Sequence, residues 1–448
     1  MEIPTATSDM SNLDDHYVRS EEESRNDALM GHRRRCCFSR NKIMAIVAIS
    51  VCVIAAVTTG VVLLVTKATG GSKSGDNIRV YGTEESGECY MPRELFKELA
   101  SMQHLGGFNV KDPAEAIKYM KFIQLTKKFN KKYNDVSEKH SAFMNYRRNY
   151  DVVASHQFNR KATYTMDFNH FFDKDMKEVA SKLLHKIDIP REENIKTNIT
   201  DTLVKESNQA LYATLKNYSL SYGHPRIGTK VTFEDIDWRR AGGVSPVKDQ
   251  GMCGSCWAFA AVSAVESIFK IENNMDVRLS EQELVSCQLS CQGCNGGYSD
   301  YALNYIKVNG IHSTDKWPYI ANDGNCVPRE GVKYHIGGYM GAKGPYIATQ
   351  LLVMAPTVVY VAVSDDLMHY SGGIFNGECS DTELNHAVLL VGEGYDSELK
   401  KRYWLLKNSW GPNWGEDGYF RLERTDTQTD KCGVLSYGYM PYKPSISS

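Results

Sequence analysis

The chain has 448 residues, of which 42% are hydrophobic and 24% are charged, so its length and composition allow two or three globular domains. The formal net charge at pH 7 is only −2. Because nucleic-acid-binding domains carry a marked excess of lysine and arginine, this balance excludes a protein built mainly to bind nucleic acid.

The N-terminal part predicts a cytosolic tail followed by a membrane anchor. Residues 1–42 are polar and are expected to be disordered. Residues 43–65 contain no charged side chain, and about 20 apolar residues cross a bilayer as a helix, so this stretch predicts a single transmembrane signal anchor. A buried core helix is the alternative, but such helices are usually shorter or carry a polar stripe. A cleaved signal peptide would be shorter and would begin closer to Met1.

The charges that flank this span predict its orientation. Basic residues are more frequent before it (Arg33, Arg34, Arg35, Arg40 and Lys42) than after it (Lys67, Lys73 and Arg79). The positive-inside rule therefore predicts a type II membrane protein, with the N-terminus in the cytosol and the rest in the lumen or outside the cell. Asn198 and Asn217 begin glycosylation sequons on that side. Cys36 and Cys37 lie just inside the membrane, as palmitoylation sites or as free thiols.

A stalk and a helical region are predicted after the span. Residues 66–90 are polar and contain a glycine pair, which is typical of a stalk. Residues 91–225 are expected to form a mainly helical unit. Four apolar residues at steps of three or four mark one helical face, namely Phe122, Leu125, Phe129 and Tyr133. A second helix is predicted at about residues 200–218.

The last region, residues 226–448, is predicted to be a separate domain with its own core. Glycine and tryptophan become frequent from about Val231, and most of the 12 cysteines lie there: Cys253, Cys256, Cys287, Cys291, Cys294, Cys326, Cys379 and Cys432. Such a cluster indicates disulfides in an oxidising compartment or metal ligands in a reducing one. The predicted lumenal location favours disulfides.

Cys256 is the candidate nucleophile. It precedes a helical stripe of apolar residues, so it is predicted to begin a helix, where the dipole and the free N–H groups lower a thiol pKa. A thiolate is the reactive form. Two alternatives are a redox pair with Cys253 and a zinc site shared with Cys291 and Cys294. The long gap between the two cysteine pairs and the lumenal location disfavour both.

His386 is the candidate acid/base partner of Cys256. It begins a strand rich in valine and leucine, a turn around Ser397 follows, and Asn408 ends the next predicted strand. If the two strands form a hairpin centred on Ser397, His386 and Asn408 face each other within hydrogen-bonding distance. Asn408 would then hold one imidazole nitrogen and leave the other for the thiol. A histidine in a core strand with no catalytic role is the alternative.

These motifs resemble the papain family of cysteine proteases. His386 and Asn408 follow Cys256 at the ~130–150 residues typical of that family. Five motifs match in order: Asp237-Trp238-Arg239, residues 245–250, Cys294-Asn295-Gly296-Gly297, His386-Ala387-Val388 and Asn408-Ser409-Trp410-Gly411. The resemblance implies an α+β fold of two lobes, one helical and one a β-barrel. It also implies an endopeptidase acting on proteins and peptides, with neither metal nor cofactor.

The resemblance also implies roles for further residues. Gln250 would donate to the oxyanion, and Trp410 would shield the hydrogen bond between Asn408 and His386. Gly296 and Gly297 would bind the substrate backbone as an extended strand. Disulfides are implied between Cys253 and Cys294, Cys287 and Cys326, and Cys379 and Cys432. Cys291 is then left over, either free or paired with another lumenal cysteine such as Cys89.

The helical unit resembles the inhibitory propeptide of this family. Glu138, Asn149 and Val153 fit its helical motif, Ala142 and Gln157 depart from it, and residues 169–173 fit a second motif. The resemblance implies that this segment fills the cleft until acid weakens it, and that the mature chain begins between Tyr222 and Val231. Together with the anchor, it resembles the membrane-anchored falcipain-like proteases of protozoan parasites. A precursor in the secretory or endolysosomal pathway and a mature form in an acidic compartment are expected.

The pocket for the second substrate residue before the cut is expected to be apolar and shallow. By position it would be lined by Tyr298, Tyr360, Leu384, Ala387 and Tyr437, which predicts a preference for a medium aliphatic side chain. Two other classes remain as alternatives. A catalytically silent scaffold on this fold would have lost the nucleophile, and an exopeptidase or ligase would carry an insertion that blocks one end of the cleft.

Overall fold

The computed structural model describes residues 77–80, 89–188 and 236–447. The chain divides into two compact units, one ending at Cys89 and the other beginning at Tyr90. The short strands β1 (Asn77–Val80) and β2 (Cys89–Pro92) lie near this boundary in the sequence. All functional groups discussed below belong to the second unit.

Several predictions from the sequence fall outside the described residues. These are the cytosolic tail, the span at 43–65, the helix at 200–218, both sequons (Asn198 and Asn217) and the start of the mature chain. Within the described ranges, no helix has the length and apolar character needed to cross a bilayer.

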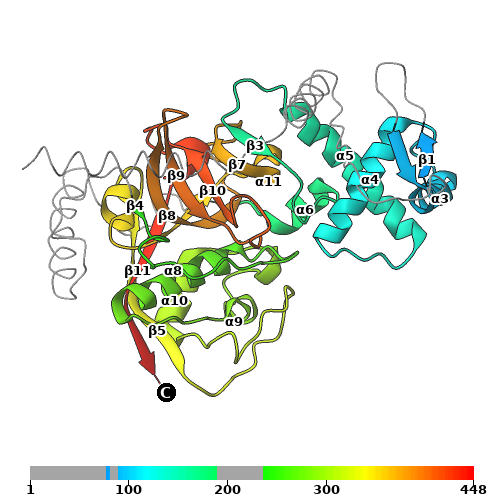
Figure 1. Cartoon of the computed structure of the whole chain (residues 1–448). Coiled ribbons are helices and arrows are strands. Elements are labelled where there is room, and N and C mark those ends of the chain that lie inside the picture. Colours follow the sequence, from blue (N-terminus) through cyan, green and yellow to red (C-terminus); the bar gives the residue numbers. More distant parts are fainter. Residues whose placement is uncertain (1–76, 81–88, 189–235, 448) are drawn as a thin grey trace, which may run out of the picture. The chain divides into compact units, whose positions relative to one another are not determined.

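A helical subdomain opens the second unit (Figure 1). Its elements are α3 (Arg93–Met102), η1 (Gln103–Leu105), α4 (Pro113–Lys128), α5 (Val136–His156), β3 (Tyr164–Met166) and α6 (Met176–Leu183). Asp112, Asp135 and Asp175 cap α4, α5 and α6 by accepting hydrogen bonds from first-turn N–H groups. Its core is aromatic and fully buried, with Phe122, Phe143, Tyr146 and Phe172 in mutual contact.

The apolar stripe predicted in this subdomain is longer than the helix that carries it. Phe129 is already the C-cap of α4, and Asn130 has a left-handed backbone, so Tyr133 lies beyond the helix. The ring of Tyr133 nevertheless stacks on Phe122, and its hydroxyl donates to Asp173 at 3.0 Å. The two propeptide motifs meet in the same way, since Asn149 Nδ2 donates to the backbone carbonyl of Phe172 at 3.0 Å.

The helical lobe of the C-terminal domain is built on one long buried helix. It consists of α8 (Cys256–Asn273), α9 (Glu281–Cys287), η3 (Gly293–Asn295) and α10 (Ser299–Asn309). The predicted stripe on α8 is buried, and so are most other side chains from its first residue to Phe269. A helix that is apolar all round must be covered on every side, and α8 packs against both α10 and the sheet lobe.

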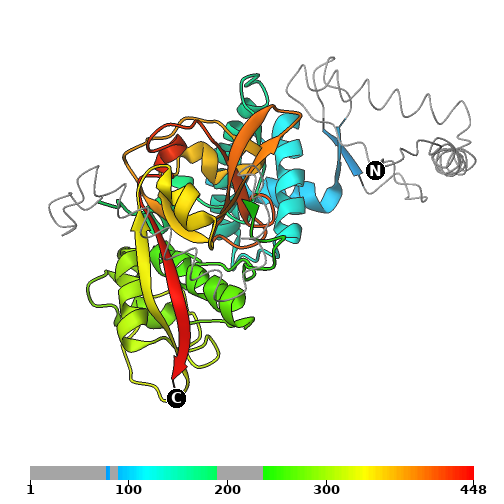
Figure 2. The same ribbon diagram turned by 90° about the vertical axis from the view of Figure 1, so that its left-hand side faces the viewer.

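The other lobe is a twisted, mainly antiparallel sheet (Figure 1). Its strand order is β3-β7-β10-β9-β8-β6-β11-β5, and β4 also pairs with β8. The strands are β4 (Ile236–Asp237), β5 (Lys333–Ala342), β6 (Thr357–Val361), β7 (Tyr370–Phe375), β8 (His386–Asp396), β9 (Lys401–Lys407), β10 (Tyr419–Glu423) and β11 (Gly438–Ser447). Short helical segments join them: η4 (Ile347–Leu352), α11 (Asp365–Met368) and η5 (Lys431–Gly433). Figure 2 shows β5 and β11 side by side. The two strands are antiparallel, and β11 leads to the C-terminus.

The predicted hairpin exists, but its predicted register is wrong. Strands β8 and β9 pair with Asp396 opposite Lys401 and with Leu389 opposite Lys407, and a bulge lies at Val391. The pairing is therefore centred beyond Ser397, and the ladder partner of His386 is Val361 on β6.

Candidate active site

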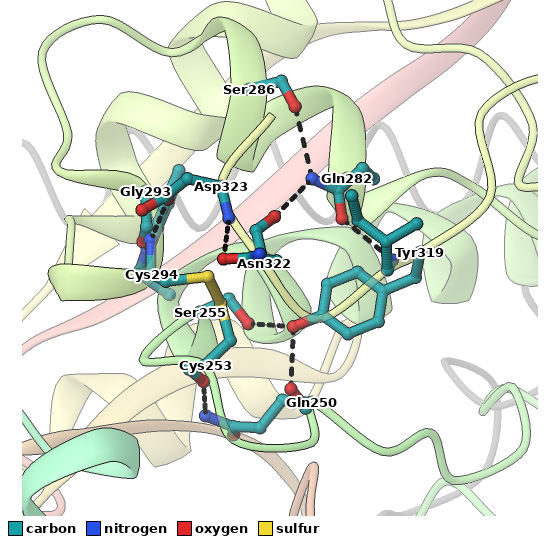
Figure 3. Close-up of a disulfide and its surroundings, with 12 residues drawn as sticks. Gln250, Cys253, Ser255, Gln282, Ser286, Gly293, Cys294, Tyr319, Asn322 and Asp323 are labelled. Carbon is teal, nitrogen blue, oxygen red and sulfur yellow. Dashed lines mark hydrogen bonds between the residues drawn. A yellow bond between two sulfur atoms is a disulfide. The ribbon is translucent and has the colours of Figure 1, made fainter. Parts of the chain in front are cut away.

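Cys256 is the first residue of α8 and is fully buried. The backbone N–H groups in the first turn of a helix have no hydrogen-bond partner within the helix, and those at the start of α8 lie near the Cys256 sulfur. The loop before Cys256 is held by the disulfide between Cys253 and Cys294 and by the bond from Gly254 N–H to the Cys294 carbonyl at 2.8 Å (Figure 3). This fixed loop gives the thiol a defined position.

The disulfides decide between the alternatives for these cysteines. The structure contains the three bridges that the family resemblance implies, and Cys256 and Cys291 are free. Since Cys253 is bound to Cys294, it forms no redox pair with Cys256, and Cys294 cannot ligate zinc. The Cys291 sulfur accepts from Tyr298 N–H at 3.4 Å, and burial raises the pKa of its thiol to about 11. Cys291 is therefore a protonated packing residue, not a second nucleophile.

His386 and Asn408 meet as predicted from the sequence, although they are not ladder partners. His386 Nε2 and Asn408 Oδ1 are 2.8 Å apart, and because an amide oxygen only accepts, Nε2 carries the proton. His386 Nδ1 is buried without a hydrogen-bond partner among the described residues. The ring of Trp410 lies 4.8 Å from the imidazole and is 1% exposed, so it keeps water away from this bond.

The thiol lies between two imidazoles, and this sets its pKa. One belongs to His386. The other belongs to His185 of the helical subdomain, whose Nδ1 is 3.9 Å from Cys256 Sγ. Burial opposes ionisation of the thiol, but the positive charges of His185 and His386, together with the contact from His185 Nδ1, outweigh it and lower the pKa of Cys256 to about 5. The sulfur is thus a thiolate at neutral pH.

Gln250 is oriented toward the same loop. It is fully buried, its Oε1 accepts from Ser409 Oγ at 2.6 Å, and its Nε2 donates to the Cys253 carbonyl at 2.8 Å. Because a carbonyl only accepts, the contact with Cys253 fixes which end of the amide is the nitrogen. The second N–H of Nε2 remains for another acceptor. Tyr319 supports the loop by linking the Gln250 carbonyl to Ser255 Oγ (Figure 3).

The end of the helical subdomain lies against the edge that the family resemblance implies for substrate binding. The N–H groups of His185 and Ile187 donate to the carbonyls of Asn385 and Leu384 at 3.1 and 2.9 Å. The His185 ring also lies 3.2 Å from both N and O of Gly297. Gly296 has φ +119°, and a Cβ there would meet the His185 ring at 2.5 Å, so this edge requires glycine.

Three of the five residues predicted to form the specificity pocket line one pocket in the structure. Tyr298, Tyr360 and Tyr437 line it, together with Asp300 and Tyr439, which the sequence reasoning missed. Ile187 and Asp188 of the helical subdomain close it. Leu384 and Ala387 are buried nearby but do not line this pocket.

The helical subdomain is also fixed to the sheet lobe beyond the cleft. Strand β3 pairs with the edge strand β7, and Tyr164 opposes Gly373. Asn169 Nδ2 donates to the Met368 carbonyl at 2.8 Å, and the Phe171 ring contacts Trp410 edge-on. This second motif therefore lies directly behind the catalytic pair.

His170, in the same motif, is a half-buried residue whose Nε2 atom is buried and has no hydrogen-bond partner among the described residues. Burial lowers the pKa of His170, while Asp249 raises it in part and Lys131 lowers it further. The neutral ring is therefore favoured in the docked state. His170 therefore leaves the binding of the propeptide to the C-terminal domain at full strength above the ordinary imidazole pKa. Binding weakens as the pH falls and the ring becomes charged.

Comparison with known proteins agrees with this geometry. Residues 232–442 match the papain family cysteine proteases, and residues 122–179 match the cathepsin propeptide inhibitor domain. A cysteine proteinase of Theileria annulata is 36% identical over 350 residues, covering 77% of this chain and 78% of the relative. Falcipain-2b of Plasmodium falciparum is 35% identical over 332 residues, covering 71% of this chain and 66% of the relative.

A solved structure shows the same architecture. Procathepsin L2 from the larval midgut of Tenebrio molitor aligns with a TM-score of 0.59 and 30% identity, covering 73% of this chain and all of that chain. The chain therefore belongs to the papain family of cysteine proteases. It is a falcipain-like cysteine endopeptidase, made as a zymogen with an inhibitory propeptide, and the helical subdomain is part of that propeptide.

Proposed function

We propose that Cys256 is the nucleophile of this endopeptidase, His386 its general acid and base, Asn408 the group that orients His386, and Gln250 a donor to the oxyanion. The observation that carries the proposal is the arrangement around one sulfur. A buried free thiol with a pKa of about 5 begins a helix, and one of the two imidazoles that lower this pKa, that of His386, is hydrogen-bonded to an amide.

The proposed reaction has two steps. The Cys256 thiolate attacks the peptide carbonyl, and the new oxyanion accepts from Gln250 Nε2 and Cys256 N–H. The C–N bond then breaks, the leaving amine takes a proton from the imidazolium of His386, and a thioester remains. In the second step His386 removes a proton from water, the hydroxide adds to the thioester, and the thiolate leaves as the carboxylic acid product forms.

The proposed substrate preference is a medium aliphatic side chain in the pocket lined by Tyr298, Tyr360, Tyr437 and Tyr439. Ile187 of the propeptide, an aliphatic residue, lines this pocket from the propeptide side, and its N–H donates to the Leu384 carbonyl. A library of peptides blocked at both ends should be cut internally, with leucine, isoleucine or valine second before the cut. Selection of arginine there would contradict the preference. Cleavage confined to free ends would favour an exopeptidase instead.

We also propose that the precursor is anchored as a type II membrane protein through residues 43–65. The uncharged stretch and the preceding basic residues support this. In microsomes, an epitope placed at the N-terminus should be digested by added protease, while the C-terminal domain should be protected and the propeptide should be glycosylated at Asn198 or Asn217. Complete extraction of the precursor by carbonate, or protection of the N-terminal epitope, would contradict the anchor or its direction.

A further inference from the structure

His185 belongs to the propeptide, and its ring contacts the thiol whose activity the propeptide inhibits. Nδ1 faces Cys256 Sγ at 3.9 Å, and Nε2 lies 3.2 Å from both N and O of Gly297. The backbone N–H of His185 donates to the Asn385 carbonyl, which anchors the residue that carries this ring. The ring thus stands between the nucleophile and the strand edge that binds substrate.

The two contacts at Nε2 correspond to two protonation states of the ring. A neutral ring that donates through Nδ1 to the thiolate has a bare Nε2, which accepts from Gly297 N–H. An imidazolium donates from both nitrogens, so Nε2–H then bonds the Gly297 carbonyl while Nδ1–H still faces sulfur. The charged ring gains an ion pair with the thiolate and exchanges the Gly297 N–H for the Gly297 carbonyl as the partner of Nε2, so this site is suited to an imidazolium.

We propose that His185 is the propeptide's recognition group for the catalytic thiolate, and that its positive charge is needed for full latency of the zymogen. This inference rests on the proposed role of Cys256 as nucleophile. It assigns to one propeptide side chain a charge-based contact with the reactive sulfur, in addition to the blockage that the backbone and Ile187 provide.

Among the charged groups around His185, the Cys256 thiolate is the anion that faces its ring and can act as its counter-ion. From α8 it faces Cys256, and from β8 His386 approaches the same sulfur. The loop of Gly296 and Gly297 presents backbone. On the propeptide itself, Lys186 is paired with Asp188 at 2.8 Å in solvent, with Glu383 nearby, and Lys182 meets Gly254 through its backbone carbonyl.

The expected pH dependence follows from these partners. Burial opposes the charge on His185, but the Cys256 thiolate and the Gly297 carbonyl raise its pKa above the ordinary 6.5. A raised pKa means that the contact is fully formed below that ordinary value and is lost as the pH rises through the raised one. The thiol must also be ionised, which holds above about pH 5. Latency from His185 is therefore greatest between these limits, and its alkaline loss is opposite in sign to the acid loss expected from His170.

Alkylation of Cys256 by iodoacetamide in the intact precursor tests this inference. The rate would be measured from pH 5 to 9 by peptide mass spectrometry, which separates Cys256 from Cys291, and divided by the rate in the mature enzyme. Wild-type precursor should be best protected near pH 6 and less protected at alkaline pH. His185→Gln should be alkylated about tenfold faster near pH 6 and should lose the alkaline change.

Two further variants separate charge from shape and from general effects. His185→Lys keeps a positive charge and should remain protected to higher pH than wild type. His104→Gln changes an exposed propeptide histidine and should match wild type throughout. Equal protection of His185→Gln and wild type, or equal exposure of His185→Gln and His185→Lys, would overturn the inference. The mature chain is expected to lack position 185, so the variants should give identical mature enzymes. Absence of peptide cleavage by that mature enzyme would therefore refute the proposed role of Cys256, not the role of His185.

Discussion

Replacing Cys256 by alanine is expected to lower kcat/KM for an internal peptide bond on the order of a millionfold. The reason is that no other described group can replace the sulfur. The other free thiol, Cys291, is held protonated by a pKa of about 11. Hydrolysis of a peptide blocked at both ends by the purified mature enzyme measures the loss. Inhibition of the wild type by a thiol-directed epoxide should produce the same residual rate.

Cys291→Ala is the matched control for this experiment. It removes the second free thiol, whose sulfur contacts Tyr298 N–H, and should leave most of the activity. Equal losses in the two variants would mean that the assay reports damage to the fold. Substantial activity in Cys256→Ala would disprove the assignment of the nucleophile.

The sequence correctly predicted the contact between His386 and Asn408, but it did not predict the strand register that produces this contact. Spacing and motif order placed His386 beside Asn408, and the 2.8 Å bond bears this out. The register used to argue for it was wrong, because a bulge at Val391 shifts the pairing and Asn408 lies just past the end of β9. A single extra residue in a strand leaves no periodic signal, so hydrophobic alternation could not reveal it.

His185 was missed for a different reason. It follows the end of α6, outside both propeptide motifs and in a segment without helical or strand periodicity. Its importance arises from a contact with a residue 71 positions away in the chain, which tertiary packing alone creates. Asp300 and Tyr439 were missed likewise, since they reach the pocket from α10 and β11.

The ion-pair cluster around Glu266 on α8 could also not be predicted from the sequence. Helix α8 was predicted from its apolar stripe, yet Glu266 on that helix is 1% exposed. Its carboxylate pairs with Lys248 at 2.7 Å and accepts from Ser245 Oγ at 2.6 Å and from Leu279 N–H at 2.9 Å. Each partner comes from a different segment, so local patterns give no sign that this buried charge is compensated.

Glu266→Ala is expected to lower the free energy of unfolding of the mature domain by about 3–5 kcal/mol. The loss arises because the variant leaves one buried cation, Lys407, without the nearby negative charge. Lys248 would keep its pairing with Glu281, but Lys407, which is 3% exposed, would lose the nearby Glu266 charge. Burial already lowers the pKa of Lys407 to about 8 against the opposing effect of Glu266, so this ammonium depends on the carboxylate. Urea unfolding in a Cys256→Ala background, which prevents self-digestion, gives the value.

Asp276→Ala supplies the control, because it removes a carboxylate of the same lobe that is 60% exposed and pairs with Lys270 and Arg278 in solvent. Exposed ion pairs contribute little to stability because water and salt screen them, so the two variants should differ severalfold in their effect. Lys407 immediately precedes Asn408, so loss of the cluster should also disturb the strand end that positions the amide beside His386. Similar small losses in both variants would show that water enters the cluster and screens it, and that packing of α8 alone joins the two lobes.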